Sequence, residues 1–127
     1  MKKLAIAALL SLVAGAAMAD PVEGVWQTEP DDGSYAHITI APCGAAYCGV
    51  ISRTFKPEGA YASPNLGKTP VIDMVHNGEG NYAGKVWRPS NDKIYIGKIE
   101  LNGDNLKLAG CIVGGLLCSK QSWQRVK

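Results

Sequence analysis

The sequence predicts an all-β protein, a single small antiparallel up-and-down β-barrel of about eight strands. Three observations support this prediction. Short segments that alternate apolar and polar residues recur along the chain, turn-forming clusters separate them, and no amphipathic helix of ordinary length follows residue 19. Sequential strands joined by tight turns pair as antiparallel neighbours, so such a meander can close into a barrel.

Residues 1–19 have the three parts of a secretory signal peptide. Lys2 and Lys3 form a basic start, residues 4–13 are apolar, and small residues at 17 and 19 precede the expected cleavage site. The apolar stretch is shorter than the roughly 20 residues of a membrane-spanning helix. We therefore expect cleavage after Ala19 and a periplasmic or secreted protein. Its single β-barrel domain, residues 20–127, would have no transmembrane segment.

Loss of this leader changes the charge balance. The sequence has 13 Lys and Arg residues against 11 Asp and Glu residues, and Lys2 and Lys3 lie in the leader, so the mature chain has 11 of each sign. The cationic residues are spread along the chain without a run. This distribution argues against a nucleic-acid partner and against a polybasic membrane patch.

The expected strands and turns alternate from residue 24 to the C-terminus. Turn clusters rich in Gly, Asn, Asp and Pro occupy residues 30–34, 76–81, 89–93 and 102–105, and residues 56–68 indicate a longer loop. Gly84 and Gly97 suit strongly bent strands. The expected strands are residues 24–29, 35–41, 49–55, 69–75, 82–89, 94–101, 106–110 and 122–126.

The four cysteines all follow the leader, and an even count in an exported chain indicates disulfides. The flanking strand patterns favour pairing of Cys43 with Cys48, as facing residues beside a four-residue hairpin loop, and of Cys111 with Cys118 around a six-residue loop. A zinc site and a redox pair are the alternatives, but their usual cysteine spacings are shorter. Each staple would stabilise the fold by about 2–3 kcal/mol and pin a hairpin register.

No motif in the sequence indicates catalysis. His37 is expected on the outer face of a strand and His76 at a turn, and neither has a neighbour that suggests a nucleophile and base. The carboxylates Asp31 and Asp32 lie in a turn, where Asp is common for backbone reasons, and calcium-loop spacing is absent. We expect no enzyme activity, no metal and no cofactor.

Two groups of residues are candidates for binding. The first lies on predicted strands and would line the mouth of the barrel, although core packing is the alternative: Tyr82, Trp87, Arg88 and Tyr95. The second lies in the loop between Cys111 and Cys118, and would either contact a partner or fold inward and plug the barrel: Ile112, Val113, Leu116 and Leu117.

Several phrases together resemble a family of small secreted bacterial proteins, domain of unknown function 2147: "DPVEGVWQTE", "CGAAYCGVI", "GKVWRPSNDKIYIGKIEL", "LKLAGCI" and "LCSKQSWQRV". The resemblance covers nearly the whole mature chain and implies a calycin-type, lipocalin-like barrel in which Trp26 packs at the base against Arg125. It implies no reaction. The chain departs from the family where Trp87-Arg88-Pro89 stands in place of a common Asp-Pro.

The sequence therefore favours a non-catalytic protein that binds a small apolar or amphipathic ligand. The alternative is a structural or inhibitory envelope protein that binds another protein through its surface loops.

Overall fold

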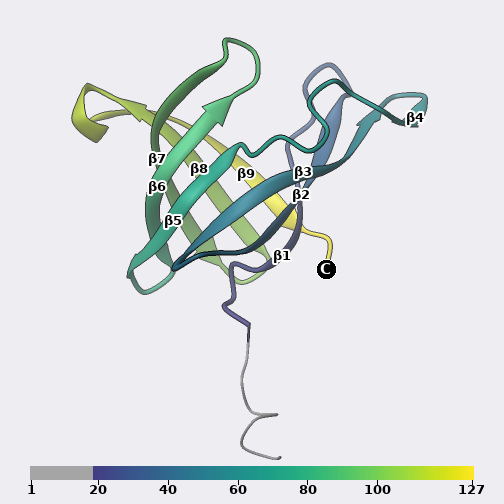
Figure 1. The fold of residues 1–127 in the computed structure, drawn as a ribbon. Coiled ribbons are helices and arrows are strands. Elements are labelled where there is room, and N and C mark those ends of the chain that lie inside the picture. Colours follow the sequence, from purple (N-terminus) through teal and green to yellow (C-terminus); the bar gives the residue numbers. More distant parts are fainter. Residues whose placement is uncertain (1–18) are drawn as a thin grey trace, which may run out of the picture.

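The computed structural model describes residues 19–127, so the predicted signal peptide, apart from Ala19, lies outside the described residues. Nine strands and one short 3-10 helix follow one another along the chain (Figure 1). They are β1 Gly24–Gln27, β2 Tyr35–Cys43, β3 Ala46–Lys56, β4 Gly59–Tyr61, β5 Val71–Gly78, β6 Asn81–Arg88, β7 Lys93–Asn102, β8 Asn105–Ile112, η1 Val113–Gly115 and β9 Leu117–Arg125.

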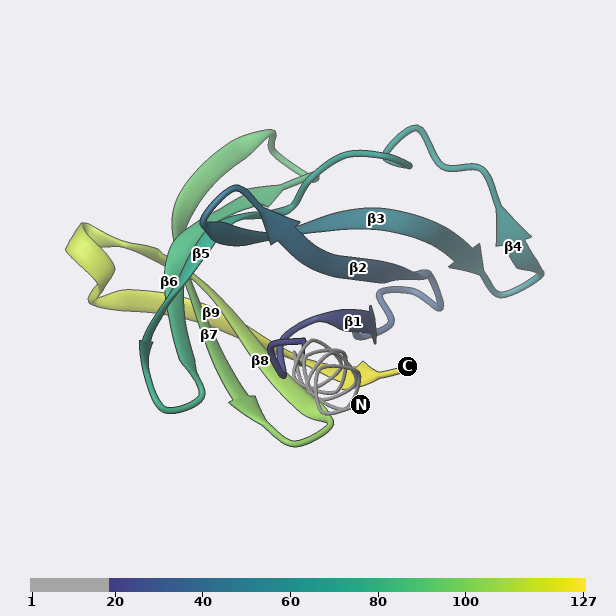
Figure 2. The same cartoon turned by 60° about the horizontal axis from the view of Figure 1, so that its bottom comes forward.

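Eight of these strands form a closed antiparallel barrel. Each strand pairs with its neighbour in the chain, and the ring closes because β1 pairs with both β2 and β9. Figure 2 shows β1 lying between β2 and the C-terminal strand β9. This topology confirms the predicted up-and-down barrel. Among residues 19–127 no helix is long and apolar enough to cross a membrane.

The predicted loop at residues 56–68 is partly wrong. Lys56 pairs with Gly59 and Thr54 with Tyr61, so β4 forms a short hairpin with β3 and lies outside the ring. Gly59 has a φ of 130°, a backbone conformation that glycine adopts far more readily than other residues. The sequence did not predict this hairpin because β4 has only three residues, too few to show the alternation typical of a strand.

Strand alternation directs one set of apolar side chains into the barrel. The buried set is dominated by Ile, Val, Leu, Met and aromatic residues from every strand of the ring, so each strand contributes to one continuous core. Its members are Val22, Trp26, Ile38, Ile40, Ile51, Val71, Met74, Tyr82, Val86, Ile99, Leu106, Leu108 and Trp123.

Two paired glycines allow the sheet to curl tightly. Gly84 of β6 lies directly opposite Gly97 of β7. A Cβ atom at Gly84 would lie 2.5 Å from the carbonyl oxygen of Ile72 and 2.6 Å from that of Asp73, and one at Gly97 would also collide with its neighbours. Both positions therefore require glycine for close backbone approach.

Candidate functional site

The two ends of the barrel differ in chemistry. The segment just before β1, the C-terminus and the β2–β3, β5–β6 and β7–β8 turns gather at one end, which we call the base. The longer connections β1–β2, β3–β5, β6–β7 and β8–β9 gather at the opposite end, which we call the mouth. The base is closed by packed side chains, whereas the mouth is open.

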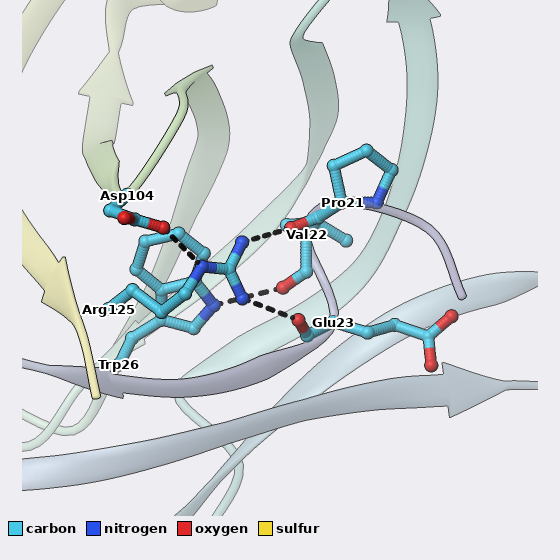
Figure 3. A network of polar contacts seen from close by, with 6 residues as sticks. All are labelled: Pro21, Val22, Glu23, Trp26, Asp104 and Arg125. Atoms are coloured by element: carbon cyan, nitrogen blue, oxygen red, sulfur yellow. Dashed lines mark hydrogen bonds and ion pairs between the residues drawn. The ribbon is translucent and has the colours of Figure 1, made fainter. Parts of the chain in front are cut away.

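Arg125 and Trp26 meet at the base (Figure 3). Their residues are paired across β1 and β9, and the guanidinium carbon lies 4.4 Å from the centre of the buried indole ring. The indole Nε1 donates to the carbonyl oxygen of Val22 at 2.9 Å. The structure therefore brings together the two residues that the family resemblance assigned to the base.

The guanidinium also ties the N-terminal segment to the end of the chain. It donates to the carbonyl oxygens of Pro21 at 2.6 Å and Glu23 at 3.0 Å, and to the Asp104 carboxylate at 2.8 Å (Figure 3). Gly24 makes room for this contact, because a Cβ there would lie 2.7 Å from Arg125 Nη1. These bonds hold the segment before β1 across the base.

Tyr82, predicted at the mouth, lies near the base instead. Its side chain is buried in the core, and its hydroxyl donates to the Asp20 carboxylate. Burial, and then this hydrogen bond, raise the pKa of Tyr82 above the usual tyrosine value. Strand alternation predicts that the side chain of Tyr82 points into the barrel. Whether Tyr82 lies at the mouth or at the base depends on its position along β6, and it lies near the start of that strand, at the base.

The open mouth leads into a cavity of about 470 Å³. Its deep part is lined by buried apolar side chains, and its outer part by polar and aromatic side chains from the connecting segments. The apolar residues are Ile38, Ile51, Val86, Leu108 and Trp123. A wall of this kind can hold an apolar group away from water.

Three of the four predicted mouth residues line this cavity: Trp87, Arg88 and Tyr95. They come from β6 and β7 on either side of one turn. The Asn91 side-chain amide donates to the Tyr95 hydroxyl at 2.7 Å, and the indole Nε1 of Trp87 donates to Asp92 at 2.7 Å. The donation from Asn91, assisted by the nearby Arg88 cation, lowers the pKa of Tyr95.

Arg88 is the cation among the residues that line the cavity, and the lining also includes two carboxylates from the β1–β2 connection, Glu29 and Asp31. Glu29 is already engaged, because its Oε2 accepts a hydrogen bond from the backbone N–H of Ser122 at 2.5 Å. Neither carboxylate forms an ion pair with Arg88 within residues 19–127. The mouth therefore presents a guanidinium that is available to a ligand.

Sequence reasoning missed the part of the cavity wall that β3 and β4 supply. Pairing of His37 with Arg53 and of Ile38 with Ile51 leaves Ser52 as an extra residue, a β-bulge. Because the bulge shifts the alternation, Thr54 is buried. Its hydroxyl donates to the Tyr61 carbonyl oxygen at 2.5 Å. A β-bulge has no reliable sequence signal, so these residues could not be assigned.

The two histidines lie in aromatic surroundings. His37 is 4.7 Å from Phe55, ring centre to ring centre, and one ring nitrogen is 3.2 Å from Gln27 Oε1; partial burial and then Arg53 lower its pKa. His76 stacks on Tyr82 at 4.7 Å. Within residues 19–127, neither imidazole is hydrogen-bonded to a hydroxyl or a carboxylate.

Both predicted disulfides are confirmed: Cys43–Cys48 and Cys111–Cys118. Cys111 and Cys118 face each other across β8 and β9. Cys43 and Cys48 do not, because Cys48 pairs with Ala41 and the turn has two residues instead of four, so their predicted facing register is wrong. Asp73 lies beside Cys43 and Cys48, but sulfurs joined in a disulfide are not thiolate ligands for a metal.

The loop between Cys111 and Cys118 lies outside the barrel. All four of its large apolar side chains are exposed, and none lines the cavity. The plug alternative is therefore wrong. These residues are Ile112, Val113, Leu116 and Leu117.

Comparisons with known proteins agree with the barrel. The family described as "Uncharacterized protein conserved in bacteria (DUF2147)" matches residues 24–125. No curated protein sequence matches this chain significantly. Among solved structures, the chain is similar to protein HP1028 from the human pathogen Helicobacter pylori, described as belonging to the lipocalin family. The identity is 15%, 84% of this chain and 83% of that chain are covered, and the TM-score is 0.63.

Proposed function

Because this chain belongs to the family of uncharacterised bacterial proteins DUF2147 and has a lipocalin-like barrel, we propose that it binds a small amphipathic ligand at the barrel mouth. The observation that carries the proposal is the cavity of about 470 Å³ with an apolar deep part and a polar rim. Ligand pockets in proteins have volumes of roughly 300–1,000 Å³, mostly apolar walls and a few polar groups that orient the ligand.

The ligand's apolar part would lie against inward-facing side chains of β2, β3, β6 and β8. These are Ile38, Ile51, Val86 and Leu108, which are buried. Burial of apolar surface contributes about 25 cal/mol per Å², so this part would supply most of the affinity. The polar part would lie near Arg88 and Tyr95 at the rim. A guanidinium without an ion-pair partner favours a carboxylate, sulfonate or phosphate at that position.

We propose a non-catalytic role and a periplasmic or secreted location. Two hydrogen bonds lie at the cavity rim, one between Asn91 and Tyr95 and one between Trp87 and Asp92. Each positions an aromatic side chain at the rim, which supports a non-catalytic role. The two disulfides are typical of an oxidising compartment, which agrees with the predicted signal peptide.

The proposal is tested by filling the cavity. Gly110 lines it, and a Cβ there would meet only Tyr95 atoms at 3.7 and 3.9 Å, which is ordinary contact. We therefore expect a Gly110→Leu chain to fold, which circular dichroism checks, with its side chain in the space beside Tyr95. The matched control is Lys85→Leu, which adds the same side chain at an exposed position of β6.

Two fluorescent probes serve as ligands: anilinonaphthalene sulfonate, which is anionic, and phenylnaphthylamine, which is neutral. Gly110→Leu should weaken both about tenfold or more, since the apolar site is filled. Arg88→Gln should weaken only the sulfonate, by about five-fold, as expected for one charged contact near the surface. Equal binding by wild-type, Gly110→Leu and Lys85→Leu chains would contradict the proposal.

Native mass spectrometry of protein purified from its host then identifies the natural ligand. We expect a bound species with wild-type protein and its loss with Gly110→Leu. A bound species that survives in the Gly110→Leu chain would lie elsewhere on the molecule and would argue against the mouth.

A further inference from the structure

A second hollow lies on the outer face of the barrel, over β7, β8 and β9. It has a volume of about 430 Å³ and is lined by three lysines, one from each strand: Lys98, Lys107 and Lys120. Lys98 and Lys120 both pair in register with Ala109, which lies between them. We call this feature the lysine hollow.

Small and polar neighbours leave the lysine hollow open. Ala109 is buried beneath the long lysine side chains although it lies on the outer face, and Asn77 and Asn81 add two amides from β5 and β6. Glu100 is the carboxylate that lines the hollow, and its oxygen lies 3.9 Å from Lys120 Nζ. Both side chains of this pair are about 60% exposed, so the interaction is weak and leaves the hollow cationic.

The hollow adjoins the exposed loop at the end of the β8–β9 hairpin. We call Ile112, Val113, Leu116 and Leu117 the apolar tip; Leu116 is the most exposed of them, at 80%. Lys98 Nζ donates to the Gly115 carbonyl oxygen at 3.3 Å, and the Cys111–Cys118 disulfide closes the hairpin beneath the tip. Figure 1 shows this hairpin projecting sideways from the barrel.

More apolar surface lies beside the tip. Ile96 of β7 pairs with Cys111, and Ile94 and Ile96 are both exposed. Exposed apolar groups that cluster on one surface mark a contact site. Here the cluster meets the lysine hollow, so an occupant must combine apolar chains with anionic groups on neighbouring parts of one surface.

An anionic phospholipid bilayer has this combination. Peripheral proteins bind such surfaces when apolar side chains enter the acyl boundary and lysines attract the headgroups. Free phosphate would fill the lysine hollow but leave the apolar tip in water. The sequence argued against a polybasic membrane patch because it contains no run of cationic residues; the barrel assembles one from positions 98, 107 and 120 in three strands.

We propose that the β8–β9 hairpin docks on the surface of an anionic phospholipid bilayer, with the apolar tip in the acyl boundary and a phosphate headgroup in the lysine hollow. This docking surface is separate from the mouth cavity: the residues lining the two have no member in common. The proposal therefore stands independently of the ligand-binding function.

Vesicle sedimentation tests the proposal with the mature, oxidised protein. The protein should sediment with vesicles of phosphatidylcholine and phosphatidylglycerol, and much less with pure phosphatidylcholine. Leu116→Asp or Leu117→Asp should weaken binding about tenfold or more, and Lys98→Gln or Lys120→Gln about five-fold each. Glu100→Gln should strengthen binding, an effect that a purely structural role does not explain.

The controls lie at the base, on the far side of the barrel from the tip. Val126→Asp places the same carboxylate at another exposed apolar position, and Lys127→Gln removes one lysine charge. Neither change should alter sedimentation. Circular dichroism melting verifies that every variant is folded, which we expect because all the substituted side chains are exposed.

Several outcomes would overturn the proposal. If the Leu116→Asp and Leu117→Asp chains bound vesicles as well as the wild-type chain, the apolar tip would have no role and only an ionic contact with the headgroups would remain. Soluble glycerophosphate should then displace the protein from the vesicles. Equal binding to neutral and anionic vesicles would exclude a role for the lysine hollow. A dimer in solution that Leu116→Asp dissociates, with no vesicle binding by the wild-type chain, would show that the apolar tip contacts a second copy.

Discussion

Replacement of Arg125 measures how the base of the barrel is held together. The guanidinium forms hydrogen bonds to two backbone carbonyl oxygens, contacts the Asp104 carboxylate and lies over the ring of Trp26. Each carbonyl bond contributes about 1 kcal/mol, and the cation–π contact about 1 kcal/mol. The Asp104 side chain is 83% exposed, so the ion pair contributes at most about 1 kcal/mol.

Arg125→Ala should therefore lower the free energy of unfolding by about 3 kcal/mol. Arg125→Lys keeps the charge but loses the planar fork, so it should lose about half as much. Asp104→Asn should lose less than about 1 kcal/mol, because it removes only the exposed ion pair. The order of the three losses follows from the geometry and is more informative than any single value.

Urea unfolding followed by tryptophan fluorescence, with both disulfides oxidised, provides the assay. With a denaturant slope of about 1–3 kcal/mol per M, Arg125→Ala should move the midpoint by about 1–3 M without changing the slope. An Asp104→Asn loss as large as that of Arg125→Ala would refute the reasoning, because the ion pair would then dominate. A wild-type midpoint for Arg125→Lys would exclude a role for the fork geometry.

Three further predictions concern other parts of the barrel. Gly84→Ala should lower the free energy of unfolding by about 2–3 kcal/mol in urea unfolding, because its Cβ would collide with backbone oxygens, whereas Gly110→Ala should cost less than about 1 kcal/mol. Because the pKa of Tyr82 is raised in the folded state, its contribution to stability is complete below pH about 10 and declines at higher pH. Between pH about 10 and 12, the free energy of unfolding should therefore fall less steeply with pH in Tyr82→Phe than in the wild-type chain. Replacement of both Cys111 and Cys118 by serine should lower stability by about 2–3 kcal/mol, and peptide mapping without reductant should detect the Cys111–Cys118 linkage in the wild-type chain. Equal losses for Gly84→Ala and Gly110→Ala would contradict the first prediction. A Tyr82→Phe chain whose stability falls with pH as steeply as that of the wild type would contradict the second. A linkage of Cys111 or Cys118 to Cys43 or Cys48 would contradict the third.

The candidate site could be predicted only in part. Trp87, Arg88 and Tyr95 were assigned to the mouth as residues on predicted strands, and all three line the cavity because they lie on either side of the β6–β7 turn. Tyr82 was misplaced, because strand alternation fixes the face of a side chain but carries no information about its height in the barrel. Thr54 was missed because the bulge at Ser52 reverses the alternation of β3.

The sequence by itself determined the properties that depend on local pattern. Alternation of apolar residues and the spacing of turns predicted an all-β meander, and cysteine spacing predicted both disulfides. The register of the paired strands depends on contacts between distant residues, and only the tertiary structure decided it. The barrel placed Arg125 over Trp26, a contact that the family resemblance had implied. It also collected Lys98, Lys107 and Lys120 around one hollow, an arrangement that no linear spacing of these residues indicates.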